Sequence, residues 1–319
     1  MCIRDSGDTW QDSAAFDNLT PSTSYTIMCR YKETDDYEAS ATVQVTTQTL
    51  DMVNAGLFDN EGGLVYSWQQ LIDNDAILVT DGVLDGGVRT DRLSGNLVID
   101  SSISSIADWA FYNTELTSVT IPAGVTSIGD CAFYLVDDLY SLEFMPNSNL
   151  KSIGAQAFDS TRLTELNLPD TVQTIGERAF QGITIDELYI PASLESVTNV
   201  FVSMGIKTIT VSPDNEYYQA IDGVLFNKSG TELVLYPNDN ERIAYTVPSS
   251  VLSIDNSAFN GCTNLEEITM PENLSNIASD VFFGCSKLES IYVPDNFVEL
   301  FKSKLVDFAD KIKPISEKV

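Results

Sequence analysis

The chain is dominated by a string that returns every 22 to 24 residues. Residues 121–133 read IPAGVTSIGDCAF and residues 168–180 read LPDTVQTIGERAF, which share a proline, V-x-x-I-G and Ala-Phe. The prolines lie at positions 122, 146, 169 and 191, and again at 248, 271 and 294. A period of this length is typical of a solenoid, in which each repeat forms one coil and stacks on the next.

Two apolar positions of the period predict the core. Phe recurs at 111, 133, 158, 180, 201, 259 and 282, and Ile or Val at 106, 128, 153, 175, 197, 254 and 277. Coils about 4.8 Å apart would align these side chains in columns. Gly129, Gly154 and Gly176 follow the Ile, and we expect a corner with positive φ there rather than a ligand-binding loop. Other residues at this position, such as Ala107, show that the requirement is not absolute.

Each repeat also carries two apolar residues three apart, which predict a strand with one buried face. The pairs are Leu116/Val119, Leu139/Leu142, Leu163/Leu166, Ile185/Leu188, Ile206/Ile209, Leu265/Ile268 and Leu288/Ile291. The positions that flank the second apolar residue point outward, and side by side they would form a ladder of hydroxyls, acids and two tyrosines. These are the candidate partner-binding residues: Ser118, Thr120, Ser141, Glu143, Glu165, Asn167, Glu187, Tyr189, Thr208, Thr210, Glu267, Thr269, Ser290 and Tyr292. Solenoids bind partners on such faces, but an ordinary solvated sheet face has the same composition, so both interpretations stay open.

The repeats resemble a known family. IPAGVTSIGDCAF, VPSSVLSIDNSAFNGCTNLEEITM and MPENLSNIASDVFFGCSKLESIYV are similar to BspA-like, or treponemal-type, leucine-rich repeats over about residues 97–315. The resemblance implies a β-rich α/β solenoid, a right-handed superhelix with short strands and short helical turns. It also implies a secreted or cell-surface protein of a microbe that binds host proteins or other cells.

The last repeat gives way to a predicted capping helix. We place the repeats at residues 97–293 and the helix and tail at 294–319. Asn296 and Glu299 have the spacing of a capping box. One helical face would carry Phe297, Leu300, Phe301, Leu305 and Phe308. This apolar face is expected to close the open end of the core, although such stripes also bind partners.

One repeat is longer than the others by about a dozen residues, and the excess lies within residues 212–247. The runs GVLF and TELVLY flank the turn NKSG and predict a hairpin. We expect this insert to elaborate one edge of the solenoid. It would be a structural flap or the lip of a binding site, and the sequence leaves both open.

Residues 1–50 form a separate β segment. LTPSTSYTIMCRY and VQVTTQT resemble the last strands of a fibronectin type III domain, which implies a truncated β-sandwich. The opening MCIRDS is similar to a translated adapter sequence, so we interpret residues 1–6 as an artefact. Residues 51–96 are expected to be a transition and N-terminal cap, with Ser67 capping a helix and Asp-Gly turns between short strands.

Composition excludes several classes of function. The formal charge is −30, which opposes binding to nucleic acid and to anionic membranes, and no apolar run is long enough to span a bilayer. Histidine is absent, so Ser-His-Asp and Cys-His sites cannot form. Asp73, Asp75, Asp81 and Asp85 lack the spacing of a calcium loop. Cys262 and Cys285 share a repeat position, and we expect buried thiols or, alternatively, a disulfide.

Together with the family resemblance, which implies adhesion and an extracellular or cell-surface location, these patterns favour a non-catalytic ligand-binding protein with no cofactor and no metal. It would act as a monomer and bind a host or microbial surface protein or a glycan. The alternative is a non-catalytic binding or spacer module of a larger secreted enzyme or cell-envelope protein.

Overall fold

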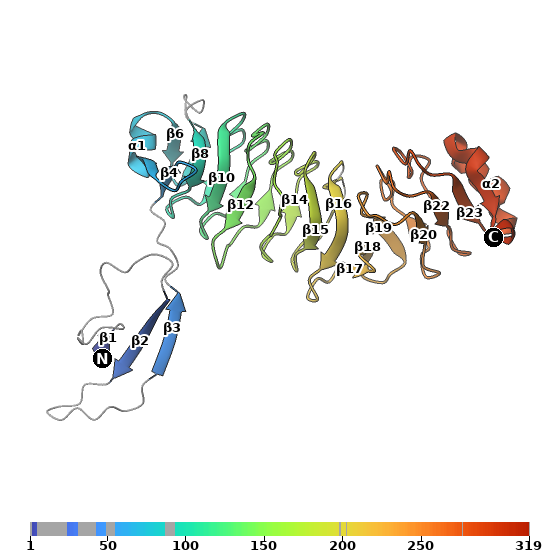
Figure 1. Ribbon diagram of the computed structural model, residues 1–319, viewed down its shortest axis with the longest axis horizontal. Helices are drawn as coiled ribbons and strands as arrows, with labels where there is room; N and C mark the ends of the chain where they lie inside the picture. The colour runs from blue at the N-terminus through green and yellow to red at the C-terminus, as the bar shows by residue number, and fades with distance from the viewer. Residues whose placement is uncertain are drawn as a thin grey trace. The chain divides into compact units, whose positions relative to one another are not determined.

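Each repeat of the sequence forms one coil of a β-solenoid in the computed structural model (Figure 1). The structure describes residues 55–86, 93–197, 199–201, 203–275 and 277–318, and the backbone of three strands before residue 49. Residues 1–54 and 55–319 form two units. In the first unit, β1 (Cys2–Arg4), β2 (Ser24–Arg30) and β3 (Val43–Gln48) pair antiparallel in that order. The expected fibronectin-type sandwich depends on residues outside the described ranges.

A coil of the second unit runs through a long strand, a turn at the repeat proline, a short strand, and a turn that carries the repeat phenylalanine. The second coil shows this path, from β10 (Glu115–Ile121) through β11 (Ser127–Ile128) to β12 (Ser141–Phe144). Because successive coils follow the same path, equivalent residues lie side by side, and Val119 on β10 pairs with Leu142 on β12.

The long strands make three sheets. Their orders are β12-β10-β8-β4-β5, β15-β16 and β20-β22-β23-β24. The bounds not yet given are β4 (Gly56–Phe58), β5 (Leu64–Ser67), β8 (Ser94–Val98), β15 (Thr184–Ile190), β16 (Gly205–Val211), β20 (Ala244–Thr246), β22 (Glu267–Thr269), β23 (Ser290–Val293) and β24 (Ile312–Pro314). The expected strand at residues 163–168 does not form, although Leu163, Leu166 and Leu168 are buried as in the other coils. The alternation of buried and exposed residues therefore persists without a strand ladder.

The short strands make two further sheets. The first has the order β14-β13-β11-β9-β7-β6 and the second β17-β18-β19-β21. Their remaining bounds are β6 (Ile77–Thr80), β7 (Val83–Gly86), β9 (Ser105–Ile106), β13 (Ser152–Ile153), β14 (Thr174–Ile175), β17 (Tyr218–Ile221), β18 (Val224–Asn227), β19 (Glu232–Leu235) and β21 (Ser253–Ile254). Ile106, Ile128, Ile153, Ile175 and Ile254 lie on the two-residue strands, whereas Val197 and Ile277 lie outside any strand. All seven are buried, which confirms this column of the core.

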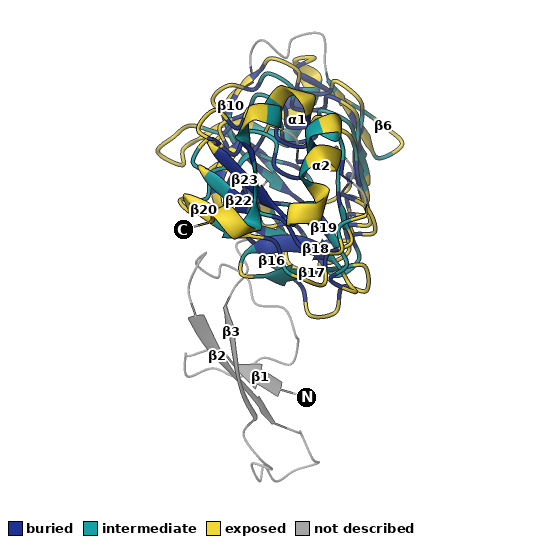
Figure 2. Ribbon diagram, turned by 90° about the vertical axis from the view of Figure 1, so that its right-hand side faces the viewer, coloured by how far each residue is buried: buried dark blue, intermediate teal, exposed yellow. Residues whose placement is uncertain are grey.

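The repeat phenylalanines form a stacked column through the core, as predicted. From Phe111 to Phe201, neighbouring rings are 5.0 to 6.4 Å apart between centroids and close to parallel. Tyr236 takes the place of a phenylalanine in the long repeat and stacks on Phe259 at 5.1 Å. Figure 2 shows the buried residues gathered inside the coils. The stacked aromatic rings, together with the surrounding Leu, Ile and Val side chains, supply apolar burial that holds one coil to the next.

The repeat glycines serve a different purpose from the one expected. Gly129, Gly154 and Gly176 do not have the positive φ that a left-handed corner would require. A Cβ at Gly154 would lie 2.4 Å from the Asp130 nitrogen and 2.5 Å from the Gly129 carbonyl carbon of the preceding coil. The prediction of positive φ is therefore wrong, and these glycines are needed because neighbouring backbones approach too closely for a side chain.

The segments that carry phenylalanine are turns, so the α/β description fits only in part. Positive φ occurs two residues after each phenylalanine of this column, at Asn113, Leu135, Ser160, Gly182, Ser203, Gly261 and Gly284. A left-handed residue interrupts the right-handed path that a helix needs. Within the described ranges, α-helix occurs only near the two ends of the solenoid, as α1 (Trp68–Asp73) and α2 (Val298–Lys304).

The N-terminal cap agrees with its local signals. Ser67 caps α1, its hydroxyl accepting from the Gln70 N–H while the Gln70 side chain accepts from the Ser67 N–H. Strands β6 and β7 are joined by Asp81 and Gly82, both with positive φ, as an Asp-Gly hairpin turn requires.

The C-terminal cap departs from its local signals. Helix α2 begins after Phe297 with no side-chain cap, so the predicted capping box of Asn296 and Glu299 is wrong. A short 3-10 turn, Asp295–Phe297, precedes it, and two others follow at Val306–Lys311 and Ile315–Glu317. Phe301 and Leu305 are buried in the core, whereas Phe297 and Leu300 are exposed. The single apolar stripe does not form because the helix ends after seven residues.

The long insert lies inside the solenoid rather than on its edge. Strand β18 is buried on both faces, with Leu225 in the core of the preceding coils and Val224 and Phe226 in the core of the following coils. The hairpin of β18 and β19 forms as predicted. Its strands are part of the wall between two cores, and neither the expected edge position nor a flap describes them.

Candidate functional site

We call the fourteen outward positions identified from the sequence the strand face. The strand register brings most of them together as expected. The register pairs are Ser118 with Ser141, Thr120 with Glu143, Glu187 with Thr208, Tyr189 with Thr210, Glu267 with Ser290, and Thr269 with Tyr292. Glu165 and Asn167 lie outside any strand, but their side chains share one side of the chain, with 3.4 Å between the Asn167 Nδ2 and a Glu165 oxygen.

Hydrogen bonds between neighbouring coils orient the polar side chains of this face. The Thr210 hydroxyl donates to Glu187 Oε1 at 2.7 Å, and the Ser118 hydroxyl donates to Asn96 Oδ1 at 2.9 Å. The Tyr189 hydroxyl donates to Asp170 Oδ1 at 3.0 Å. Burial raises the pKa of Tyr189, so its phenol remains protonated at neutral pH. The side chains are thus held in place before any partner arrives.

The C-terminal end of the strand face is covered. Ser290 and Tyr292 are only 8% and 9% exposed, contrary to the expectation that both would be accessible. Strand β24 lies beside β23, and Lys313 on β24 and Lys318 after it reach over the face. Lys313 donates to the Ser290 hydroxyl at 2.7 Å, and Lys318 pairs with Glu267 at 2.7 Å. The accessible strand face therefore ends at about β22.

A second surface, an aromatic patch of Trp109, Tyr112 and Tyr134, was not identified from the sequence. The Trp109 ring lies 5.5 Å from Tyr112 and 6.1 Å from Tyr134, and the two tyrosine rings stack at 5.8 Å. Trp109 is 53% exposed. The signal was present, because AFY occurs at 110–112 and again at 132–134, with the phenylalanine buried and the tyrosine on the surface. Exposed Trp and Tyr are typical of protein interfaces.

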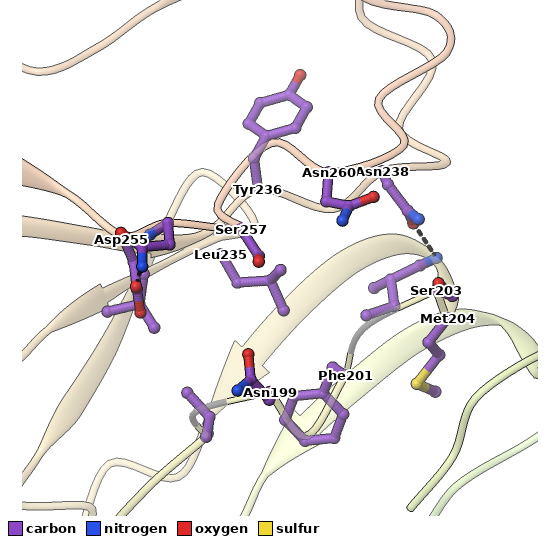
Figure 3. A pocket seen from close by; sticks show the side chains of 14 residues that line it. Asn199, Phe201, Ser203, Met204, Leu235, Tyr236, Asn238, Asp255, Ser257 and Asn260 are labelled. Carbon is purple, nitrogen blue, oxygen red and sulfur yellow. Dashed lines mark hydrogen bonds between the residues drawn. The ribbon is translucent and has the colours of Figure 1, made fainter. Parts of the chain in front are cut away.

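A small pocket lies where the long insert meets the preceding coils (Figure 3). Its volume is about 130 Å³, and its lining includes Phe201, Leu235 and several amide or hydroxyl side chains. Asn238 is already engaged, since its Oδ1 accepts from the Ile206 N–H at 3.0 Å. Ligand pockets usually measure about 300–1,000 Å³. This pocket has room for a few water molecules rather than for an organic substrate.

Histidine is absent from the chain, and the cysteines of its described part are buried. Within them, no group of three acidic or cysteine side chains is placed to hold a metal ion. Cys131, Cys262 and Cys285 are buried free thiols, and the Cys285 thiol donates to the Phe259 carbonyl at 3.0 Å. Burial raises the pKa of Cys262, which disfavours the reactive thiolate. No helix in the described part of the chain has both the length and the apolar character needed to cross a bilayer.

Stacked coils, buried Phe and Ile columns and parallel strand ladders define a β-solenoid of the leucine-rich repeat class. The sequence matches the family model described as BspA type leucine rich repeat region, in six copies, over residues 93–208 and 238–308. The chain belongs to this family. Membership confirms the resemblance seen in the repeats and leaves the fibronectin-like segment outside the match.

The fold is shared with a solved structure, and two other solved structures are similar in sequence. A leucine-rich repeat protein from Eubacterium ventriosum is 24% identical with a TM-score of 0.53, covering 68% of this chain and 69% of its own. The pneumococcal vaccine antigen PcpA is 26% identical with a TM-score of 0.46, covering 61% of this chain and 50% of its own. A leucine-rich cell surface protein from Faecalibacterium prausnitzii is 25% identical with a TM-score of 0.38, covering 76% of this chain and 93% of its own. Among curated proteins, no match is found.

Proposed function

We propose that this chain is a non-catalytic binding module of a secreted or cell-surface protein, and that it binds a protein or glycan partner through its strand face. The observation that carries the proposal is the in-register ladder of outward side chains, as in the pairs Glu187 with Thr208 and Tyr189 with Thr210. An extended, regularly spaced polar surface on a stiff scaffold suits a partner that is itself extended.

The chemistry of the face supports binding rather than catalysis. Its groups are hydroxyls, carboxylates, one amide and tyrosine rings, which are hydrogen-bonding and interface-forming groups. Family membership supports the surface location, because the resemblance of the repeats implies secreted and surface proteins. In this proposal the chain acts as a monomer and presents the face to solvent.

A binding screen with a charge-reversed face tests the proposal. The protein would be immobilised and exposed to extracellular matrix proteins, microbial surface proteins and a glycan array. The triple variant Glu143→Lys, Glu165→Lys, Glu187→Lys should lose any partner that the unaltered chain captures. The matched control reverses three exposed glutamates away from the strands, Glu61, Glu177 and Glu272, and should keep it. Retained capture by the face variant, with the fold intact, would place binding on another surface.

A further inference from the structure

The strand face already holds an ammonium group, and the group belongs to the chain itself. Lys318 Nζ lies 2.7 Å from Glu267 Oε1 and donates to the Thr269 hydroxyl at 2.7 Å. It also lies over the Tyr292 ring, 5.3 Å from the centroid. A carboxylate, a hydroxyl acceptor and an aromatic face together match the three ways in which a lysine ammonium is bound.

Lys313 arrives on an extended strand, whereas Lys318 follows the short 3-10 turn at Ile315–Glu317. Strand β24 pairs in parallel with β23 and sets Lys313 opposite Tyr292 in the register. From there Lys313 donates to the Ser290 hydroxyl at 2.7 Å and lies 6.0 Å from the Tyr292 ring centroid. Strand β24 therefore shows how an extended basic segment can place a lysine ammonium group on outward positions of this sheet.

The same positions recur in the middle of the face with similar groups. Glu165 and Asn167 flank Leu166, and Glu187 and Tyr189 flank Leu188. In the same way Glu267 and Thr269 flank Ile268, and Ser290 and Tyr292 flank Ile291. We call the first four residues the central set. In both sets the first coil supplies a glutamate and a second hydrogen-bonding residue. The next coil supplies a tyrosine at its second outward position. The central set has one more carboxylate, because Glu187 replaces Ser290.

The central set is accessible and has no cation. Glu165, Asn167 and Glu187 are exposed and Tyr189 is half-buried. Within the described part of the chain, no lysine or arginine pairs with either glutamate. Asp170 fixes the Tyr189 hydroxyl, and Thr210 fixes Glu187, so the ring and the carboxylate are oriented in advance.

We propose that the central set binds the ammonium group of a lysine on an extended basic segment of a partner protein. This rests on the proposed function, since it names the partner chemistry of the same face. The formal charge of −30 favours approach of such a segment, and the tyrosine ring with its flanking glutamates selects an ammonium over a neutral group.

Isothermal titration of the full chain at physiological ionic strength tests this inference. The probe is an acetylated and amidated peptide of alternating glycine and lysine, about eight residues long, which reaches across several strands. Glu165→Gln with Glu187→Gln should weaken binding about 5- to 10-fold, whereas Glu177→Gln with Glu272→Gln, the same change of charge elsewhere, should weaken it less than about 2-fold. Tyr189→Leu should weaken binding about 3-fold without changing charge, and Tyr189→Phe, which keeps the ring, should not.

Two results would overturn the inference. One is equal weakening by the two glutamine pairs, which would mean attraction to the overall charge alone. The other is equal binding of the peptide with acetylated lysines, which has no ammonium group. If the screen finds a partner that depends on the strand face while the lysine peptide fails to bind, the proposed function stands and this inference fails. If no partner depends on the face, the proposed function fails whatever the peptide does.

Discussion

Phe133 and Phe158 lie parallel in neighbouring coils, with ring centroids 5.0 Å apart and ring planes inclined by 5°. Both side chains are completely buried, and each also stacks on a phenylalanine of the coil beyond. The repeat string therefore recurs along this chain because it packs the core, and its phenylalanine is too buried to contact a partner.

Removing one ring should open a gap between two coils. We expect Phe158→Ala to lower the free energy of unfolding by about 3–5 kcal/mol, because it loses apolar burial and leaves a cavity that its neighbours cannot fill. Urea denaturation followed by circular dichroism measures this. Phe283→Ala is the control, since Phe283 is 71% exposed beside the buried Phe282, and its change should stay within about 0.5 kcal/mol. Equal losses would contradict a core made by the phenylalanine column.

Close backbone contact at the repeat glycine predicts a steric effect. We expect Gly154→Ala to destabilise the fold by about 1–3 kcal/mol, because its Cβ would overlap the backbone of the preceding coil. At Gly124 the nearest atom to a new Cβ is the Ile103 carbonyl oxygen at 3.4 Å, so Gly124→Ala should be neutral or slightly stabilising. Thermal denaturation of both variants separates the two cases, and a tolerated alanine at position 154 would refute the steric account.

Two tyrosines predict opposite effects of the same substitution. The Tyr236 hydroxyl is buried with no hydrogen-bond partner among the described residues, and burial raises the pKa of Tyr236 to about 12. Tyr236→Phe should therefore leave stability unchanged or raise it by up to about 1 kcal/mol. The Tyr218 hydroxyl accepts from the Val197 N–H at 3.2 Å, so Tyr218→Phe should cost about 1 kcal/mol. Denaturant midpoints compare them, and a loss at position 236 would reveal a missed partner.

Glu232 on β19 gives a prediction about pH. Burial, and then the nearby Asp255, raise the pKa of Glu232 above its ordinary value. A raised native pKa means that protonation favours the fold, so this stabilisation is present in acid and is lost as the pH rises through that native pKa. Glu232→Gln should therefore raise the unfolding midpoint at pH 7, and the gain should shrink in acid.

Urea titrations across the acid-to-neutral range check the Glu232 prediction. The control is Glu272→Gln, which removes the same charge at an exposed turn. A gain at Glu232→Gln that stays constant with pH would point to a packing effect of the amide rather than to the charge.

The sequence predicts local and periodic features well and close contacts poorly. The Phe column, the Ser67 cap and the hairpin of β18 and β19 follow from spacing and turn chemistry, which act over a few residues. The need for Gly154 arises from its distance to the backbone of the preceding coil, which no single repeat contains. The covering of Tyr292 arises from Lys318, and Lys318 also contacts Thr269, 49 residues earlier. A period reveals which residues stack, but not which distant segment folds over them.

Strand β18 affects how cooperatively the solenoid unfolds. In a simple repeat array each coil contacts only its neighbours, so one half can melt while the other survives. In this chain Leu225 is anchored in one core while Val224 and Phe226 are anchored in the other. Unfolding of either core removes the packing from one face of this four-residue strand and so destabilises the other core. The longest repeat therefore couples the two cores, so that we expect them to unfold together as one cooperative unit.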